Sequence, residues 1–232
     1  MTAATLAINE VFGPTLQGEG PNLGRRAAFV RVARCNLSCS WCDAHFTWDW
    51  TRHDPATEVH TMAVADVHDQ VLAMRCQLVV LTGGEPLLQQ RGLTALASLL
   101  RGSGCEVEVE TNGTRPPDPR LSALVRYNVS PKLANSGLPW EQRIRPEVLR
   151  TFGQLPGTAL KFVVADPADL EEVGEVVAAA GIPAGMVWVM PEGVTAERVL
   201  AGHAELADLV VDLGWNMTTR LHVLAWGDER GR

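Results

Sequence analysis

The sequence predicts an α/β protein in which a mostly parallel sheet forms a barrel-like domain that uses the whole chain. Short apolar, β-branched runs alternate with longer amphipathic patterns along its 232 residues, as expected when helices connect parallel strands. Gly- and Pro-rich turns follow several of the apolar runs. Functional groups of parallel α/β sheets collect at these strand ends, so we expect the site there.

The individual elements follow from the same alternation. Strands are predicted at Ala27–Val32, Leu78–Leu81, Val107–Glu110, Tyr127–Val129, Leu160–Val164, Met186–Met190 and Leu221–Leu224. Helices are predicted at Val64–Met74, Leu93–Arg101, Pro167–Ala180 and Ala196–Leu213. Asp43–Thr61 lacks clear periodicity and is predicted to be a loop with some helix.

Composition excludes some classes of partner. There are 27 acidic and 20 basic residues, which give a formal net charge of −7, so the chain has no general attraction for nucleic acid or anionic membranes. No stretch approaches the roughly 20 apolar residues of a membrane span. Met1 to Glu10 lacks a basic region followed by a long apolar run, as a signal peptide would have. We expect a cytoplasmic protein without nucleic-acid or membrane partners.

Three of the five cysteines lie within eight residues, with the spacing C-x3-C-x2-C. They are Cys35, Cys39 and Cys42. Thiolates suit iron–sulfur clusters and zinc. A four-iron cluster with three cysteine ligands has one open iron, which can chelate the amino and carboxylate groups of S-adenosylmethionine (SAM). The alternative is a structural zinc site that His45 completes. Cys76 and Cys105 are predicted to be buried apolar residues.

Two motifs give the first resemblance. The cysteine spacing, with the aromatic Trp41 before the last cysteine, resembles the radical SAM superfamily signature. The turn Thr82–Pro86 (TGGEP) after an apolar run resembles the GGEP motif that meets the SAM amino group. The resemblance implies a partial (β/α)6-type radical SAM barrel over residues 1–232. Residues 1–34 would form an N-terminal substrate-binding element and the first strand, and about residues 226–232 a flexible tail.

Further motifs narrow the resemblance. TLQGEG, FVR, CNLSCSWCD, TGGEP, ETNG and SPK follow one another at Thr15–Gly20, Phe29–Arg31, Cys35–Asp43, Thr82–Pro86, Glu110–Gly113 and Ser130–Lys132. Together they resemble the 7-carboxy-7-deazaguanine synthase family, lyases of 7-deazapurine (queuosine) biosynthesis. Lys161 keeps the family pattern more loosely. The resemblance implies ring contraction of 6-carboxy-5,6,7,8-tetrahydropterin to 7-carboxy-7-deazaguanine, with release of ammonia, after abstraction of the C6 hydrogen by an adenosyl radical.

The same resemblance implies the site residues and partners. Substrate contacts would come from Leu16, Gln17, Gly18, Arg31, Thr82 and His222, with Arg31 on the substrate carboxylate. SAM contacts would come from Trp41, Cys42, Asp43, Gly84, Glu85, Ser130, Pro131 and Lys132. No residue is assigned as catalytic, and the general base for proton loss stays open. A homodimer and a flavodoxin-like or other electron donor are implied.

One position departs from the family. A Thr or Ser two residues after the third cysteine usually ligates Mg²⁺, and here that position is Ala44. Mg²⁺ prefers oxygen ligands and keeps several waters, so Thr47 or Asp49 is the candidate substitute and His45 is less suited. We expect weaker or altered Mg²⁺ dependence.

Two alternatives remain at this point. Another radical SAM enzyme, such as a glycyl-radical activating enzyme, would share the cluster and the GGEP turn but would act on a protein. A zinc-binding interaction module would be colourless, whereas a four-iron cluster makes anaerobically purified protein brown.

Overall fold

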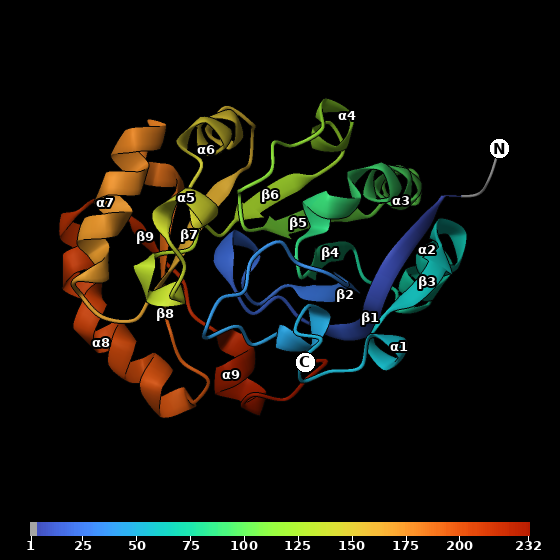
Figure 1. Cartoon of the computed structure of the whole chain (residues 1–232), viewed down its shortest axis with the longest axis horizontal. Helices are drawn as coiled ribbons and strands as arrows, with labels where there is room; N and C mark the ends of the chain where they lie inside the picture. The colour runs from blue at the N-terminus through green and yellow to red at the C-terminus, as the bar shows by residue number, and fades with distance from the viewer. Residues whose placement is uncertain (1–3) are drawn as a thin grey trace. The chain divides into compact units, whose positions relative to one another are not determined.

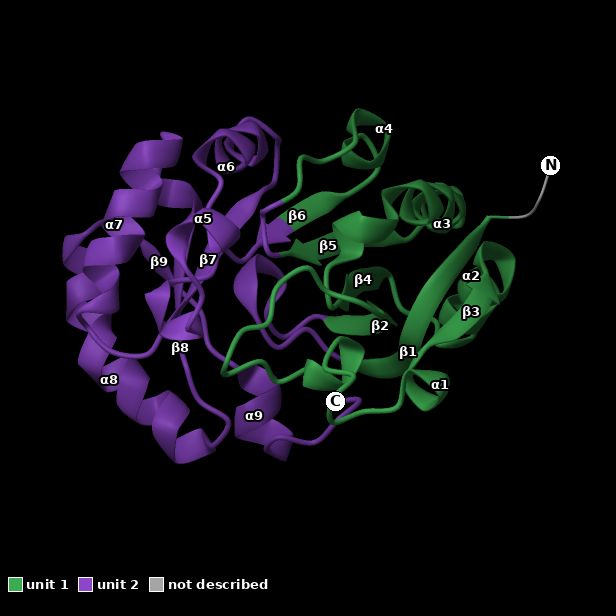
Figure 2. Ribbon diagram, viewed as in Figure 1, with its two compact units in different colours: residues 1–15, 26–111, 115–127 green, residues 16–25, 112–114, 128–232 purple. Residues whose placement is uncertain are grey.

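Parallel strands and the helices between them make up most of the chain (Figure 1). The computed structural model describes residues 4–232, so the first three residues of the predicted N-terminal element lie outside the described residues. Two compact units are distinguished (Figure 2). Unit 1 holds the described residues up to Thr15, with Arg26–Thr111 and Arg115–Tyr127, and unit 2 holds Leu16–Arg25, Asn112–Thr114 and Asn128–Arg232.

Unit 1 is built on five strands in the order β3-β1-β2-β4-β5. The strands are β1 (Thr5–Leu16), β2 (Arg26–Val32), β3 (His60–Ala63), β4 (Leu78–Gly83) and β5 (Glu106–Thr111). β3 is antiparallel to β1, whereas β2, β4 and β5 are parallel. The helices of this unit are α1 (Pro55–Glu58), α2 (Val64–Ala73), α3 (Gln90–Gly102) and α4 (Pro119–Ser122). Two 3₁₀ turns, η2 (His45–Thr47) and η3 (Pro86–Gln89), follow β2 and β4.

Local sequence explains these elements. The run Leu78–Leu81 of β4 is completely buried, as the uninterrupted apolar pattern of a central parallel strand requires. α3 buries Leu93, Leu96, Ala97 and Leu100, which recur at the spacing of one helix face. Asp54 caps α1 by accepting a hydrogen bond from the Ala56 N–H. These elements form a buried sheet covered by amphipathic helices. The packing holds the ends of the strands in defined positions.

Unit 2 continues with parallel strands. β6 (Arg126–Val129) begins at the end of unit 1 and is followed by β7 (Ala159–Val164), β8 (Val187–Pro191) and β9 (Asn216–Met217), in the order β6-β7-β8-β9. β7 runs parallel to β6 and to β8, and β9 runs parallel to β8. The helices are α5 (Trp140–Arg143), α6 (Pro146–Gly153), α7 (Asp169–Ala180), α8 (Ala196–Asp212) and α9 (Leu221–Trp226), with 3₁₀ turns η1 (Gly20–Asn22), η4 (Ala134–Ser136) and η5 (Ala184–Met186).

The predicted α/β class with a mostly parallel sheet is confirmed, as are six of the seven predicted strands and the four predicted helices. The strand predicted at Leu221–Leu224 is wrong, because these residues begin helix α9 and the last strand is β9. A four-residue apolar run does not distinguish a strand from a helix turn. The strand predicted to be the first, Ala27–Val32, is the second strand of the structure, because β1 precedes it. β1 contains Gly13 and Pro14, which disrupt the strand pattern in the sequence.

Candidate active site

The cysteine loop begins where β2 ends. The Ala33 N–H donates to the Ala7 carbonyl at 2.9 Å, and the Arg34 N–H donates to the Thr47 carbonyl at 2.7 Å. Cys39 is buried, and Cys35 and Cys42 are partly exposed. The loop is thus fixed to β1 and to the η2 turn, and it presents its sulfurs at the carboxyl end of a parallel strand.

The predicted SAM-binding turn packs directly on this loop. The Gly84 N–H donates to the Val32 carbonyl at 3.0 Å, and the Glu85 N–H donates to the Arg34 carbonyl at 2.9 Å. A Cβ on Gly84 would lie 2.1 Å from the Arg34 carbonyl oxygen, a distance that no side chain tolerates. Gly84 is therefore required for the close approach. A ligand amino group is itself a donor, so it would bind carbonyl oxygens of the turn.

The sulfurs of Cys35 and Cys42 accept hydrogen bonds from N–H groups. The Leu37 N–H lies 3.4 Å from Cys35 Sγ, and the Trp48 indole Nε1 lies 3.3 Å from Cys42 Sγ. Burial raises the pKa of the Cys35 thiol to about 12, with smaller contributions from Glu85 and the other two cysteines. Iron ligation deprotonates a thiol, so these donors would then face thiolates.

The donor set of the loop fits an iron–sulfur cluster. Within residues 4–232, no three His, Cys, Asp or Glu side chains converge as they would around one metal ion. A cubane binds each thiolate through a different iron, so its cysteines need not converge on one point. The three soft sulfurs lie on one loop, and N–H donors are directed at those of Cys35 and Cys42. Cysteine sulfurs of iron–sulfur clusters commonly accept such hydrogen bonds in proteins.

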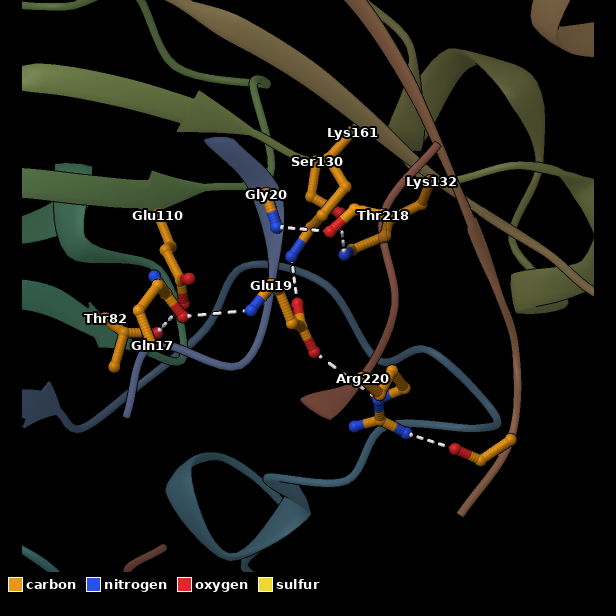
Figure 3. A network of polar contacts seen from close by, with 11 residues as sticks. Gln17, Glu19, Gly20, Thr82, Glu110, Ser130, Lys132, Lys161, Thr218 and Arg220 are labelled. Carbon is orange, nitrogen blue, oxygen red and sulfur yellow. Dashed lines mark hydrogen bonds and ion pairs between the residues drawn. The ribbon is translucent and has the colours of Figure 1, made fainter. Parts of the chain in front are cut away.

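Arg31, Thr82 and Glu110 form a row across three neighbouring strands of unit 1. Arg31 of β2 pairs in register with Thr82 of β4, so their side chains leave the same face. The Thr82 hydroxyl donates to a Glu110 carboxylate oxygen at 2.8 Å (Figure 3). The structure therefore brings together two of the predicted substrate residues and adds a carboxylate that the prediction omitted.

The Arg31 guanidinium is held in a defined orientation. Its Nε donates to Glu10 at 2.7 Å, and its Cζ lies 5.2 Å from the Phe12 ring centroid and 5.7 Å from that of Phe46. Phe12 in turn stacks on Phe29 at 5.0 Å. Cation–π contacts and one ion pair thus orient a fork of donors before any ligand binds.

Glu85 and Thr111 form a buried pair behind the glycine turn. The Glu85 side chain is completely buried, and its Oε1 accepts hydrogen bonds from Thr111 Oγ1 at 2.7 Å and from the Leu87 N–H at 2.9 Å. The carboxylate thus caps the η3 turn and links β4 to β5. The prediction that Glu85 binds SAM therefore depends on its backbone.

In unit 2, residues Leu16–Arg25 fold against the C-terminal segment. The Leu221 N–H donates to the Gly18 carbonyl at 2.9 Å, and the Gly20 N–H donates to Thr218 Oγ1 at 2.9 Å. A Cβ on Gly18 would lie 2.1 Å from His222 Nδ1, so a glycine is needed beside this ring. Two predicted substrate residues far apart in the sequence, Gly18 and His222, are therefore neighbours.

Glu19 is the centre of a buried ionic network (Figure 3). Its carboxylate binds the Lys161 ammonium and lies 3.3 Å from Arg220 Nε. Arg220 Nη1 also donates to the Gly193 carbonyl at 2.7 Å. Burial alone would raise the Glu19 pKa, but Lys161 and Arg220 together hold the pKa of this carboxyl well below its usual range. The network fixes the segment that carries Gln17 and Gly18.

Replacing Glu19 with glutamine should lower the free energy of unfolding by about 3–5 kcal/mol at neutral pH, because two buried cations lose their anion. Since the folded pKa is depressed, this stabilisation is complete above the unfolded pKa of about 4.3 and is lost as pH falls below it. Anaerobic urea unfolding at pH 7 and about pH 3 should therefore show a smaller difference between variant and parent in acid.

The matched control is Glu205→Gln, which breaks an exposed pair with Arg198 at 3.2 Å. Its expected cost is about 0–1 kcal/mol. An equal loss of unfolding free energy in the two glutamine variants would contradict the proposed stabilising role of Glu19.

The predicted SAM residues after β6 lie next to one another. Lys132 Nζ donates to Ser130 Oγ at 3.0 Å (Figure 3). Arg143 Nη1 donates to the Lys132 carbonyl at 2.9 Å, which fixes the backbone of the Ser-Pro-Lys turn. The side-chain cation of Lys132 is thus placed by hydrogen bonds at the end of a parallel strand.

The two predicted Mg²⁺ residues, Thr47 and Asp49, make hydrogen bonds within the loop. The Thr47 hydroxyl is completely buried and donates to the Ala44 carbonyl at 2.7 Å. Asp49 accepts hydrogen bonds from Thr51 Oγ1 at 2.5 Å and from Arg52 Nε at 2.6 Å, one on each carboxylate oxygen. These hydrogen bonds lower the pKa of Asp49 to about 2. Both side chains are therefore committed to the loop itself.

Several site residues could not be identified from the motifs alone. They are Glu10, Trp48, Thr218 and Arg220, whereas Glu19 and Glu110 were seen only as parts of TLQGEG and ETNG. A glutamate within a Gly-rich segment, with a lysine in a buried apolar strand, was the one available signal for the Glu19–Lys161 pair. Nothing in the spacing indicated Arg220.

The fold and the cysteine loop define the chain as a radical SAM protein. A family model described as "Radical SAM superfamily" matches residues 29–135, the segment from the middle of β2 to the η4 turn. The crystal structure titled QueE from Escherichia coli aligns with a TM-score of 0.73 at 24% identity, over 94% of this chain and 95% of that chain. This likeness shows the shared fold.

The chain belongs to the 7-carboxy-7-deazaguanine synthase family. It is 42% identical to the 7-carboxy-7-deazaguanine synthase of Pyrobaculum aerophilum, over 97% of this chain and 96% of the relative. The protein of the same name from Hyperthermus butylicus is 36% identical over 94% and 92% of the two chains. The chain is thus a radical SAM enzyme. Among the described residues, no helix combines the length and apolar character needed to cross a membrane.

Proposed function

We propose that the chain converts 6-carboxy-5,6,7,8-tetrahydropterin to 7-carboxy-7-deazaguanine and ammonia in 7-deazapurine (queuosine) biosynthesis. The observation that carries this proposal is the three-cysteine loop seated on the Gly83–Gly84 turn at the end of β2 and β4, beside a row of polar side chains. The family relationship supports the choice of substrate.

Cys35, Cys39 and Cys42 would hold the four-iron cluster, and Trp41, Cys42, Asp43, Gly84, Glu85, Ser130, Pro131 and Lys132 would contact SAM. The cluster, when bound, supplies one electron that cleaves SAM to methionine and a 5′-deoxyadenosyl radical. The residues of the chain would bind the cofactor: carbonyl oxygens of the turn at Gly84 would accept hydrogen bonds from its amino group, and Lys132 and Ser130 offer a cation and a hydroxyl.

Arg31, Thr82, Leu16, Gln17, Gly18 and His222 would contact the pterin. A carboxylate substrate meets the Arg31 guanidinium, which Glu10 and two phenylalanine rings already orient. Thr82 donates its hydroxyl hydrogen to Glu110, so its oxygen could act towards a ligand only as an acceptor. Preorganisation of this kind would help to hold the substrate in one orientation for reaction.

The reaction itself is the direct test. Anaerobically reconstituted protein is mixed with 6-carboxy-5,6,7,8-tetrahydropterin, SAM and a chemical reductant, and products are followed by ultraviolet absorbance and mass. We expect 7-carboxy-7-deazaguanine. Cleavage of SAM without this product would favour another radical SAM reaction, such as activation of a glycyl-radical partner. Colourless protein with about one zinc per chain would favour a structural zinc module.

The enzyme would also need an electron donor and would act as a homodimer in the cytoplasm. The substrate is a small molecule, and a flavodoxin-like or other electron donor would reduce the cluster. We propose a homodimer in the cytoplasm without nucleic-acid or membrane partners, in keeping with the net charge of −7. Sedimentation of the reconstituted protein tests the oligomeric state.

Turnover should show weaker or altered dependence on added Mg²⁺ than in a relative with Thr at this position, because Ala44 has no side-chain oxygen and Thr47 and Asp49 make hydrogen bonds within the loop. The assay compares EDTA-treated protein with protein given a Mg²⁺ titration. The matched variant is Ala44→Thr, which restores a hydroxyl and should gain stimulation by the ion. Strong, saturable stimulation of the parent protein at micromolar Mg²⁺ would overturn the expectation.

A further inference from the structure

The indole of Trp48 is directed at one of the three cluster cysteines. Its Nε1 lies 3.3 Å from Cys42 Sγ, within hydrogen-bond range for sulfur. The indole nitrogen is a donor and never an acceptor, so the direction of this bond is fixed: the N–H points at the sulfur. Trp48 stands six residues after the cysteine, outside the cysteine motif.

The backbone around Trp48 sets this aim. Trp48 follows the η2 turn, and its N–H donates to the His45 carbonyl at 3.1 Å. The Thr47 N–H and hydroxyl both donate to the Ala44 carbonyl, at 2.9 and 2.7 Å. The Thr47 carbonyl accepts from the Arg34 N–H, at the start of the cysteine loop. The turn that positions the tryptophan and the loop that carries the sulfurs are therefore one hydrogen-bonded structure.

A hydrogen bond to a cluster thiolate stabilises the state with more negative charge. Reduction adds one electron to the cluster and increases the charge on its sulfurs, so a donor at Cys42 favours the reduced form. Such contacts beyond the ligands are a main means by which proteins set reduction potentials. The donor also makes the cluster easier to reduce by an external electron donor, while it lowers the driving force for electron transfer to SAM.

We propose that Trp48 is a positioning residue that raises the reduction potential of the cluster through its N–H to Cys42. This inference rests on the proposed ligation of the cluster by Cys35, Cys39 and Cys42. Trp48 touches a ligand and need not touch substrate or cofactor. Its effect is therefore on the reduction potential of the cluster, and the positions of the bound reactants do not depend on it.

The test compares two tryptophans of the same loop. Trp48→Phe removes the N–H and keeps an aromatic ring, whereas Trp50→Phe makes the same change at a residue that is 38% exposed. Both variants are reconstituted anaerobically, assayed for iron, and titrated electrochemically while the reduced cluster is followed by electron paramagnetic resonance. We expect Trp48→Phe to bind as much iron as the parent and to have a more negative reduction potential. Trp50→Phe should keep the parent potential.

A second measurement uses an unchanged position 48. Protein containing tryptophan labelled with ¹⁵N in the indole ring is reduced and examined by pulsed electron paramagnetic resonance. A weak ¹⁵N coupling to the cluster is expected, and it should persist in labelled Trp41→Phe and Trp50→Phe. This result tests the contact between the indole and the cluster even if Trp48→Phe does not fold or bind iron.

The outcomes separate the two levels of the proposal. Iron-replete Trp48→Phe with the parent potential, or labelled Trp41→Phe without a ¹⁵N coupling, overturns the role of Trp48 and leaves the cluster ligands intact. Parent protein that fails to bind about four irons per chain overturns the ligand assignment, and the inference about Trp48 fails with it.

Discussion

Replacing Cys42 with alanine is expected to reduce iron from about four per chain to near background and to abolish SAM cleavage. Two cysteines on the loop cannot hold a cubane that leaves only one iron open. The alanine also leaves the Trp48 indole N–H without the sulfur that it contacts at 3.3 Å. Iron and sulfide analysis, visible absorbance and release of 5′-deoxyadenosine measure the effect.

Cys76→Ala is the matched control for this change. Cys76 is buried at 7% exposure and precedes β4, outside the cysteine loop, so its loss should leave iron content and SAM cleavage intact. The expected cost of the control is a modest decrease in thermal stability from lost packing. An iron-replete, active Cys42→Ala protein would refute the proposed ligand set.

Replacing Arg31 with lysine is expected to lower kcat/KM for the carboxylated pterin roughly 10- to 100-fold, the range for loss of a charge-assisted hydrogen bond. Lysine keeps the charge and loses the planar fork that binds a carboxylate through two parallel bonds. It also loses the stacking of the guanidinium between Phe12 and Phe46. Steady-state kinetics with the pterin varied at saturating SAM measures the change.

Arg26→Lys provides the comparison, because Arg26 begins the same strand and its guanidinium donates to the Met74 and Arg75 carbonyls. Its kinetics should match those of the parent. A pterin that lacks the 6-carboxylate should bind both Arg31→Lys and the parent with similar weak affinity. If Arg31→Lys lowers binding of both pterins equally, the guanidinium does not recognise the carboxylate.

Local signals predicted the elements and the motifs well. β4 was visible because four consecutive residues, Leu78–Leu81, are buried and apolar, and the Gly83–Gly84 turn followed directly. The cysteine loop was visible from its spacing, because its ligands lie within eight residues. Features whose partners are close in sequence could be identified without coordinates.

Contacts between distant segments could not be predicted in the same way. Glu19 pairs with Lys161 and Arg220, which lie 142 and 201 residues away, and no periodicity connects such positions. Arg31 was assigned to the substrate carboxylate, but its ion pair with Glu10 emerged only when β1 proved to be a long strand. The helix at Leu221–Trp226 was missed because its apolar run is too short to show a helical period.

The contacts of residues 16–25 also set the order in which the protein can be completed during synthesis. The Gly20 N–H binds Thr218, 198 residues later, and the Gly18 carbonyl accepts from the Leu221 N–H. A nascent chain emerges from its N-terminus and folds in units as it does so. The cysteine loop and the strands around it are therefore made early. The segment proposed to bind the pterin obtains its partners only after Thr218 and Leu221 have been synthesised.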